Sequence, residues 1–156
     1  MHIQIAIRVL GILLMMFSLT MLPPVLVSFF YQDGMASVFL EAFTVTFVTG
    51  FFLWLIFVRN TAEMRIKDGF LVTVFFYLAL GTFGALPFVD DRGLSLSVPD
   101  ALFESFSGLT TTGATVIKGL DKLPESILYY RQQLQWLGGM GIIVLAVAIL
   151  PMLGVG

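Results

Sequence analysis

Four long uncharged stretches divide the chain. They cover residues 9–32, 42–58, 69–89 and 132–156, and most of their side chains are apolar. A helix that spans a membrane needs about 20 apolar residues to cross about 30 Å of hydrocarbon. The second stretch reaches that length if its helix begins near Ala36. The pattern therefore predicts membrane-spanning helices at residues 5–31, 36–58, 69–88 and 127–153.

The fold class that follows is an all-α membrane protein. Lipid offers no partners for backbone N–H and C=O groups, so only helices and closed barrels span a bilayer, and these runs are too long for barrel strands. Composition agrees, because 58% of residues are hydrophobic and 12% are charged, whereas soluble domains carry about 25% charged residues. Pro23 and Pro24 lack N–H groups and are expected to kink or end the first helix early.

The same composition excludes several classes of function. The chain has no cysteine, a single histidine at position 2 and a net charge of −2. These counts argue against thiol chemistry, histidine-based catalysis and a nucleic-acid partner. No sequence pattern of a hydrolase, a phosphate-binding loop or a zinc protease is present. We therefore expect neither an enzyme nor a bound cofactor.

Basic residues suggest an orientation in the membrane. Four lie on each side of the predicted spans, so their number alone decides nothing. Three of them, Arg59, Arg65 and Lys67, crowd into the short connector 59–68. Because short basic connectors favour the cytoplasm, we expect residues 59–68 and the N-terminus to be cytoplasmic.

The segment between the last two spans has its own pattern. Residues 89–99 are polar, and a short helix is predicted at residues 99–109 with Ser97 or Asp100 as its N-cap. A threonine-rich stretch around one glycine, Gly113, follows without a charge. A glycine can adopt backbone angles that align successive carbonyls, and rows of carbonyls replace the water shell of K⁺ in potassium filters. The alternative is an ordinary outer loop at residues 100–117 in a non-conducting membrane scaffold or assembly subunit.

Two stretches resemble a known family. FESFSGLTTTGATVI (103–117) and LQWLGGMGIIVLAVAILPMLGVG (134–156) are similar to the first pore repeat of bacterial Trk-type potassium uptake proteins, in particular their TrkH-type membrane subunits. The resemblance covers essentially the whole chain. It implies potassium uptake across the bacterial inner membrane, by homodimers that a cytoplasmic nucleotide-binding ring protein, TrkA, regulates. It also implies four pore repeats around one pore, so this chain would supply one quarter.

The resemblance divides the chain into two parts. Residues 1–68 would form a leading transmembrane hairpin with its cytoplasmic connector. Residues 69–156 would form the first pore repeat, with an outer helix at 69–88, a pore helix at 99–109, a filter at 110–115 and an inner helix at 127–153. We expect the chain to be a fragment, with the further pore repeats missing after Gly156.

The resemblance also assigns the filter residues. They are Thr110, Thr111, Thr112, Gly113, Ala114 and Thr115. The backbone carbonyls of Thr111, Thr112 and Gly113 are the expected K⁺ ligands. One loop cannot surround an ion, so the chain alone is not expected to conduct.

For several charged residues we expect structural roles, such as hydrogen bonding, ion pairing or contact with water. Glu104 is expected to brace the loop through hydrogen bonds. Arg131 is expected to pair with Glu104, Asp121 or Glu125, or to face water. For Glu41, near the end of a span, we expect pairing or snorkelling. Asp90 and Asp91 would either attract cations to the pore mouth or lie in a plainly solvated loop.

Glycine and aromatic residues in the predicted spans also have expected structural roles. Gly138, Gly139 and Gly141 favour close helix packing, with a hinge as the alternative. Trp54, Tyr129, Tyr130 and Trp136 are expected in the aromatic belt where the membrane meets water. The eight methionines and sixteen phenylalanines are expected to face lipid or to pack between helices, and membrane lipid is therefore an expected partner.

Overall fold

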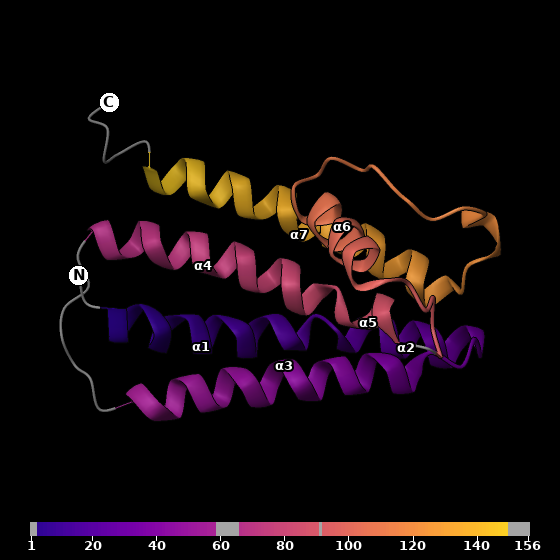
Figure 1. The fold of residues 1–156 in the computed structure, drawn as a ribbon, viewed down its shortest axis with the longest axis horizontal. Helices are drawn as coiled ribbons and strands as arrows, with labels where there is room; N and C mark the ends of the chain where they lie inside the picture. Colours follow the sequence, from indigo (N-terminus) through magenta and orange to yellow (C-terminus); the bar gives the residue numbers. More distant parts are fainter. Residues whose placement is uncertain (1–2, 59–65, 91, 150–156) are drawn as a thin grey trace.

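The computed structural model describes residues 3–58, 66–90 and 92–149, and all regular elements in these ranges are helices. They are α1 (Ile3–Leu19), α2 (Leu22–Tyr31), α3 (Ala36–Phe57), α4 (Ile66–Gly84), α5 (Leu86–Val89), α6 (Val98–Leu109), the 3₁₀ turn η1 (Leu120–Lys122) and α7 (Glu125–Ile149). The all-helical prediction is thereby confirmed. The long helices lie side by side and alternate in direction, so α1 begins and α7 ends at the same end of the molecule (Figure 1).

The leading helices pack through two small residues. A Cβ on Gly11 of α1 would lie 2.6 Å from the carbonyl oxygen of Gly50, and a Cβ on Gly50 of α3 would lie 2.7 Å from that of Gly11. No side chain fits at either position without moving the backbones apart. Close backbone approach through small residues is the usual packing of membrane helices, and here it holds α1 against α3.

Prolines interrupt two of the predicted spans. The span predicted at 5–31 is divided at Thr20 and Met21, directly before Pro23 and Pro24, so the expected break is confirmed. The span predicted at 69–88 is also divided, between α4 and α5, and this break was not predicted. Pro87 is the reason, because it cannot donate to the carbonyl four residues earlier.

A hydrophobic core among the described residues lies where α2, α3 and α5 meet α6 and α7. Phe39, Phe88 and Tyr130 are fully buried there, and the rings of Phe39 and Phe88 lie 5.3 and 5.5 Å from that of Tyr130. Tyr130 was expected at the membrane surface, and that expectation is wrong. Its ring fills the core and its hydroxyl donates to the carbonyl of Gly84 at 3.0 Å.

Three helical segments among the described residues are long and apolar enough to cross a membrane, namely Gln4–Tyr31, Ala36–Phe57 and Val72–Val89. Large apolar side chains on these segments are exposed, as expected against lipid, and Leu26, Phe30 and Ile56 are each more than 60% exposed. The fourth predicted span, 127–153, corresponds to α7, but its end lies outside the described residues. Most of the basic connector 59–68 also lies outside them.

Candidate functional site: the loop after α6

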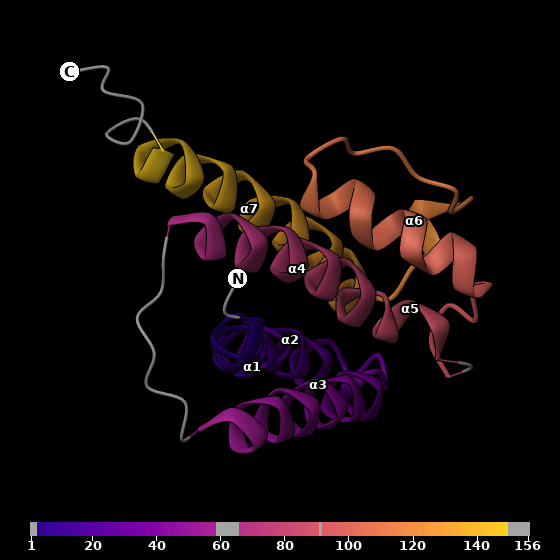
Figure 2. The same ribbon diagram turned by 60° about the vertical axis from the view of Figure 1, so that its left-hand side comes forward.

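Helix α6 reaches only part of the way along the molecule. It starts near α5, runs back beside α4 and α7, and ends where the loop turns round (Figure 2). Ser97 caps its start by accepting a hydrogen bond from the amide of Asp100 at 3.3 Å. Its end lies against the middle of α7, where a Cβ on Gly138 would come within 2.0 Å of the Leu109 carbonyl oxygen. Gly138 therefore serves close packing at this point, as predicted for this residue.

Two hydrogen bonds orient the threonine-rich stretch after α6. The amides of Thr112 and Gly113 both donate to the carbonyl of Ser107, at 3.0 and 3.3 Å. In a trans peptide, the N–H points opposite to the preceding C=O, and the described chain has no cis peptides. The carbonyls of Thr111 and Thr112 consequently point away from α6, toward the exposed side of the loop.

The carbonyl of Ala114 is oriented differently. It accepts a hydrogen bond from the Ser107 hydroxyl at 2.6 Å, so it points toward α6. Ser107 thus holds the loop twice, through its own carbonyl and through its side chain. The carbonyls of Thr111 and Thr112 thus point away from α6, whereas that of Ala114 points toward it.

The backbone of the loop adopts two left-handed conformations. Gly113 has φ = 72°, which glycine accepts without strain. Thr111 has φ = 57°, and this conformation costs a residue with a Cβ about 1–2 kcal/mol. Strain of this kind persists where surrounding contacts impose it and is common at functional sites.

Glu104 holds the outer part of the loop. Its Oε1 accepts hydrogen bonds from the Thr115 hydroxyl and from the amide of Val116, the latter at 2.7 Å. Its Oε2 pairs with Arg131 of α7, with both Nε and Nη2 at 3.1 Å. Glu104 is 4% exposed and Arg131 is 9% exposed. The predicted brace by Glu104 is confirmed, and of the alternatives left open for Arg131 the structure shows the pair with Glu104.

The sequence of the chain matches a known protein family. The family described as TrkH, cation transport protein, matches residues 35–156. The chain belongs to the TrkH family. Membership of a cation transport family and the candidate membrane-spanning helices agree that it is a membrane protein, as its sequence predicts.

Individual TrkH relatives agree over the whole chain. The Trk system potassium uptake protein TrkH of Halomonas elongata is 58% identical over 156 residues, which are 100% of this chain and 32% of that protein. TrkG of Escherichia coli K12, also a Trk system potassium uptake protein, is 43% identical over 99% of this chain and 32% of its own length. The crystal structure of the potassium transporter TrkH from Vibrio parahaemolyticus matches with a TM-score of 0.92 at 54% identity, over 100% of this chain and 33% of that chain. The chain spans about a third of the length of these relatives.

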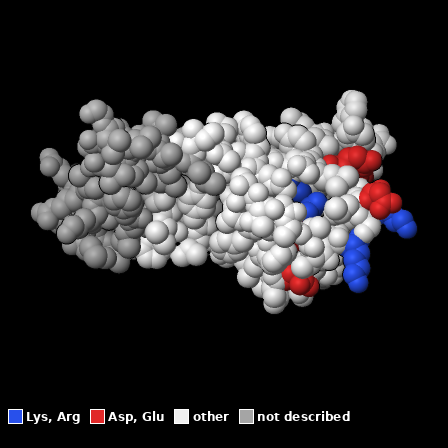
Figure 3. All heavy atoms as spheres, turned by 90° about the horizontal axis from the view of Figure 1, so that it is seen from above, with Lys and Arg blue, Asp and Glu red and all other residues white. Residues whose placement is uncertain are grey.

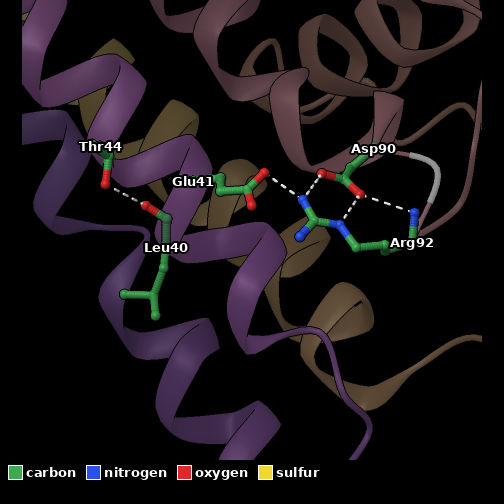
Figure 4. Close-up of polar contacts among 5 residues, drawn as sticks. All are labelled: Leu40, Glu41, Thr44, Asp90 and Arg92. Atoms are coloured by element: carbon green, nitrogen blue, oxygen red, sulfur yellow. Dashed lines mark hydrogen bonds and ion pairs between the residues drawn. The ribbon is translucent and has the colours of Figure 1, made fainter.

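An exposed ion cluster lies at the end of this TrkH chain where α5 ends. Arg92 bonds to Asp90 at 2.7 Å and also to Glu41 of α3 (Figure 4). On the described part of the face drawn in Figure 3, the charged side chains lie over the half that is away from the grey residues. The hydrogen bond from Arg92 lowers the pKa of Asp90, while Asp90 and Glu41 raise the pKa of Arg92. Glu41 therefore pairs, as expected, and Asp90 is engaged by Arg92; Asp91 lies outside the described residues.

Two hydrogen-bonding residues of the structure were not predicted from the sequence. Ser107 was not singled out, although a small hydroxyl residue two positions before the end of α6 could have been noticed. Gln133 of α7, whose side chain donates to the carbonyl of Thr20 at 2.8 Å, was not singled out either. It is a polar residue in an apolar span, and that contrast is the signal that could have found it.

Proposed function

We propose that this chain forms the leading hairpin and the first pore unit of a potassium uptake protein of the bacterial inner membrane, and that it supplies one quarter of the pore. Membership of the TrkH family supports potassium as the transported ion, because the relatives are named potassium uptake proteins. The loop after α6 supports the location of the filter, because it turns back beside the middle of α7 rather than at the end of the bundle.

The carbonyl orientation in the loop carries this proposal. Because Ser107 accepts from the amides of Thr112 and Gly113, the preceding carbonyls of Thr111 and Thr112 can face an ion. With the Gly113 carbonyl they would replace water around a dehydrated K⁺. The C-terminal end of α6 carries a partial negative charge, which adds to the attraction for a cation. K⁺ would then move down its electrochemical gradient without covalent chemistry.

The proposed assembly follows from the length of the relatives and from the geometry of one loop. A single filter segment covers one side of an ion, so three further pore repeats would complete the ring. The proposal includes a homodimer, a regulatory TrkA ring on the cytoplasmic side and a cytoplasmic N-terminus. The exposed residues of the filter, Thr110 to Thr115, would then face the other repeats and the ion path.

The test compares two glycines with nearly the same backbone. Gly113 and Gly34 have φ = 72° and 78°, and a Cβ on either has no neighbour closer than 4.0 Å. Gly113→Asp and Gly34→Asp in the complete protein should therefore carry the same left-handed strain of about 1–2 kcal/mol. K⁺ uptake would be measured in bacteria that lack their own potassium uptake systems, at matched amounts of protein in the membrane.

The two variants should differ sharply in uptake. Gly113→Asp should abolish it, because a carboxylate at the filter traps or blocks the ion, while Gly34→Asp should retain most of it. Normal K⁺ uptake by Gly113→Asp would reject the filter assignment. Equal loss in both variants would show that backbone strain, not the ion path, explains the effect.

A further inference from the structure

The proline break in the first span leaves a backbone acceptor without its helical donor. In a continuous helix, the carbonyl of Thr20 would accept from the amide of residue 24, but Pro24 has no N–H. The side chain of Gln133 fills this vacancy, since its Nε2 donates to the Thr20 carbonyl at 2.8 Å. Gln133 lies in α7, so a side chain of the pore unit completes the backbone of the leading hairpin.

Gln133 belongs to a row of three anchoring positions on α7, which we call the anchor face: Ser126, Tyr130 and Gln133. Their spacing of four and three residues places them on one side of the helix. The amide of Ser126 donates to Asp33 at 3.0 Å, and the hydroxyl of Tyr130 donates to the carbonyl of Gly84 at 3.0 Å. The anchor face therefore joins α7 to the hairpin turn, to the end of α4 and to the break between α1 and α2.

A neighbouring face of α7 carries the contacts to the filter loop. Arg131 pairs with Glu104, which in turn holds the amide of Val116. Leu134, three residues after Arg131, lies close to α6: a Cβ added to Gly108 would be 3.0 Å from the Cβ of Leu134. The position of α7 about its axis consequently decides where Glu104 and the loop lie.

Burying the amide side chain of Gln133 in an apolar span costs free energy unless its hydrogen bonds compensate. Its Oε1 is buried and has no hydrogen-bond partner among the described residues. A buried amide oxygen without a partner costs free energy that leucine at this position would avoid. The gain that offsets this cost is the bond to Thr20, because an unpaired backbone carbonyl in hydrocarbon is also costly.

We propose that Gln133 is a positioning residue for ion discrimination: by binding the Thr20 carbonyl it fixes α7 relative to the leading hairpin, and through Arg131 and Glu104 it fixes the filter loop. The leading hairpin then contributes to selectivity without touching an ion. This inference rests on the proposed function, since it assumes that residues 111–113 line the ion path.

The experiment uses the complete protein and a double variant that separates the link between the helices from the pairing of the Thr20 carbonyl. Gln133→Leu removes the donor and keeps a side chain of similar size. Gln132→Leu is the matched control, because Gln132 is its exposed neighbour. Pro24→Ala restores an N–H four residues after Thr20, so the double variant Pro24→Ala/Gln133→Leu can satisfy that carbonyl within its own helix. The readouts are the ratio of K⁺ to Na⁺ uptake at matched membrane abundance and the hydrogen exchange of the amides of Thr112 and Val116.

The proposal requires three results together. Gln133→Leu should lower the K⁺/Na⁺ uptake ratio by about fivefold, the factor that corresponds to a net hydrogen bond of about 1 kcal/mol, and should speed amide exchange in the loop. Gln132→Leu should match the wild type, and Pro24→Ala/Gln133→Leu, which still lacks the hydrogen bond between α7 and the hairpin, should keep the lowered ratio. Recovery of the ratio in this double variant would show that the unpaired Thr20 carbonyl, and not the position of α7, causes the effect, and would overturn the inference. An unchanged ratio and unchanged exchange in Gln133→Leu would overturn the inference, and so would a proportional loss of K⁺ and Na⁺ uptake without faster exchange. Absence of K⁺ uptake by the wild type would instead reject the proposed function, while the exchange measurement would still decide whether Gln133 fixes the loop.

Discussion

Glu104 is the residue on which the filter loop and α7 both depend. Its two carboxylate oxygens contact different elements: Oε1 accepts hydrogen bonds from Thr115 and Val116 in the loop, and Oε2 accepts from Arg131 of α7. Glu104→Gln removes the negative charge and leaves the buried guanidinium of Arg131 uncompensated. Removing one partner of a buried ion pair costs about 3–5 kcal/mol. We expect a loss of stability of about 3 kcal/mol together with a large loss of K⁺ uptake.

Thermal unfolding of the complete protein in detergent measures this effect. Asp121→Asn is the matched control, because Asp121 is an exposed acid in the same connection between α6 and α7, and it should leave stability unchanged within about 0.5 kcal/mol. The double variant Glu104→Gln/Arg131→Gln removes the unpaired charge and should be more stable than Glu104→Gln alone. A Glu104→Gln protein as stable as Asp121→Asn would contradict the bracing role.

At the scale of elements, adjacent glycines in α7 make different contacts with the pore helix. A Cβ on Gly138 would overlap the Leu109 carbonyl, at 2.0 Å, whereas a Cβ on Gly139 would meet only the Thr111 methyl group at 3.8 Å. Gly138→Ala should therefore push α6 from α7, with a loss of more than about 2 kcal/mol in stability, typical of overpacking. Gly139→Ala should be neutral or gain up to about 1 kcal/mol from helix propensity.

The same pair of variants separates packing from a hinge. Thermal unfolding in detergent and K⁺ uptake would be measured on both alanine variants. If α7 bends at these glycines during transport, Gly139→Ala would impair uptake although it packs without a clash. Retained uptake in Gly139→Ala, with loss confined to Gly138→Ala, supports packing alone.

The element pattern was largely predictable from where charges are absent along the chain. Long apolar runs between charges indicate helices because a bilayer leaves the backbone no other partner, and Pro23 and Pro24 indicate the first break. Contacts between elements were not predictable in the same way. From its residue type and its position near the end of a span, Tyr130 was predicted to lie at the membrane surface. Only the assembled fold places its hydroxyl beside the carbonyl of Gly84, where α4 ends. For the site, residue types indicated Glu104 and Gly113, but carbonyl directions depend on hydrogen bonds to Ser107 that local sequence does not specify.

At the scale of the whole molecule, Asp33 links the leading hairpin to the pore unit. It lies in the turn between α2 and α3 and accepts hydrogen bonds from Ser28, from the amide of Met35 at 3.0 Å and from the amide of Ser126 at 3.0 Å. Burial alone would raise the pKa of Asp33, but the hydrogen bonds from Ser126, Ser28 and Met35 outweigh it and lower the pKa below 3.8. The carboxylate also faces the N-terminus of α7, whose partial positive charge favours an anion.

This lowered pKa predicts how acid affects the molecule. A carboxyl group with a lower pKa in the folded state contributes stability above its unfolded value, near 3.8, and loses that contribution as the pH falls through the folded value. The melting temperature of the wild type should therefore exceed that of Asp33→Asn at pH 7, and the difference should shrink as the pH falls below about 4. Asp121→Asn, measured in the same detergent and buffers, should show no such convergence. A difference between wild type and Asp33→Asn that is equally large at pH 7 and at pH 3 would mean that the shape of the side chain, and not its charge, holds the hairpin turn against α7.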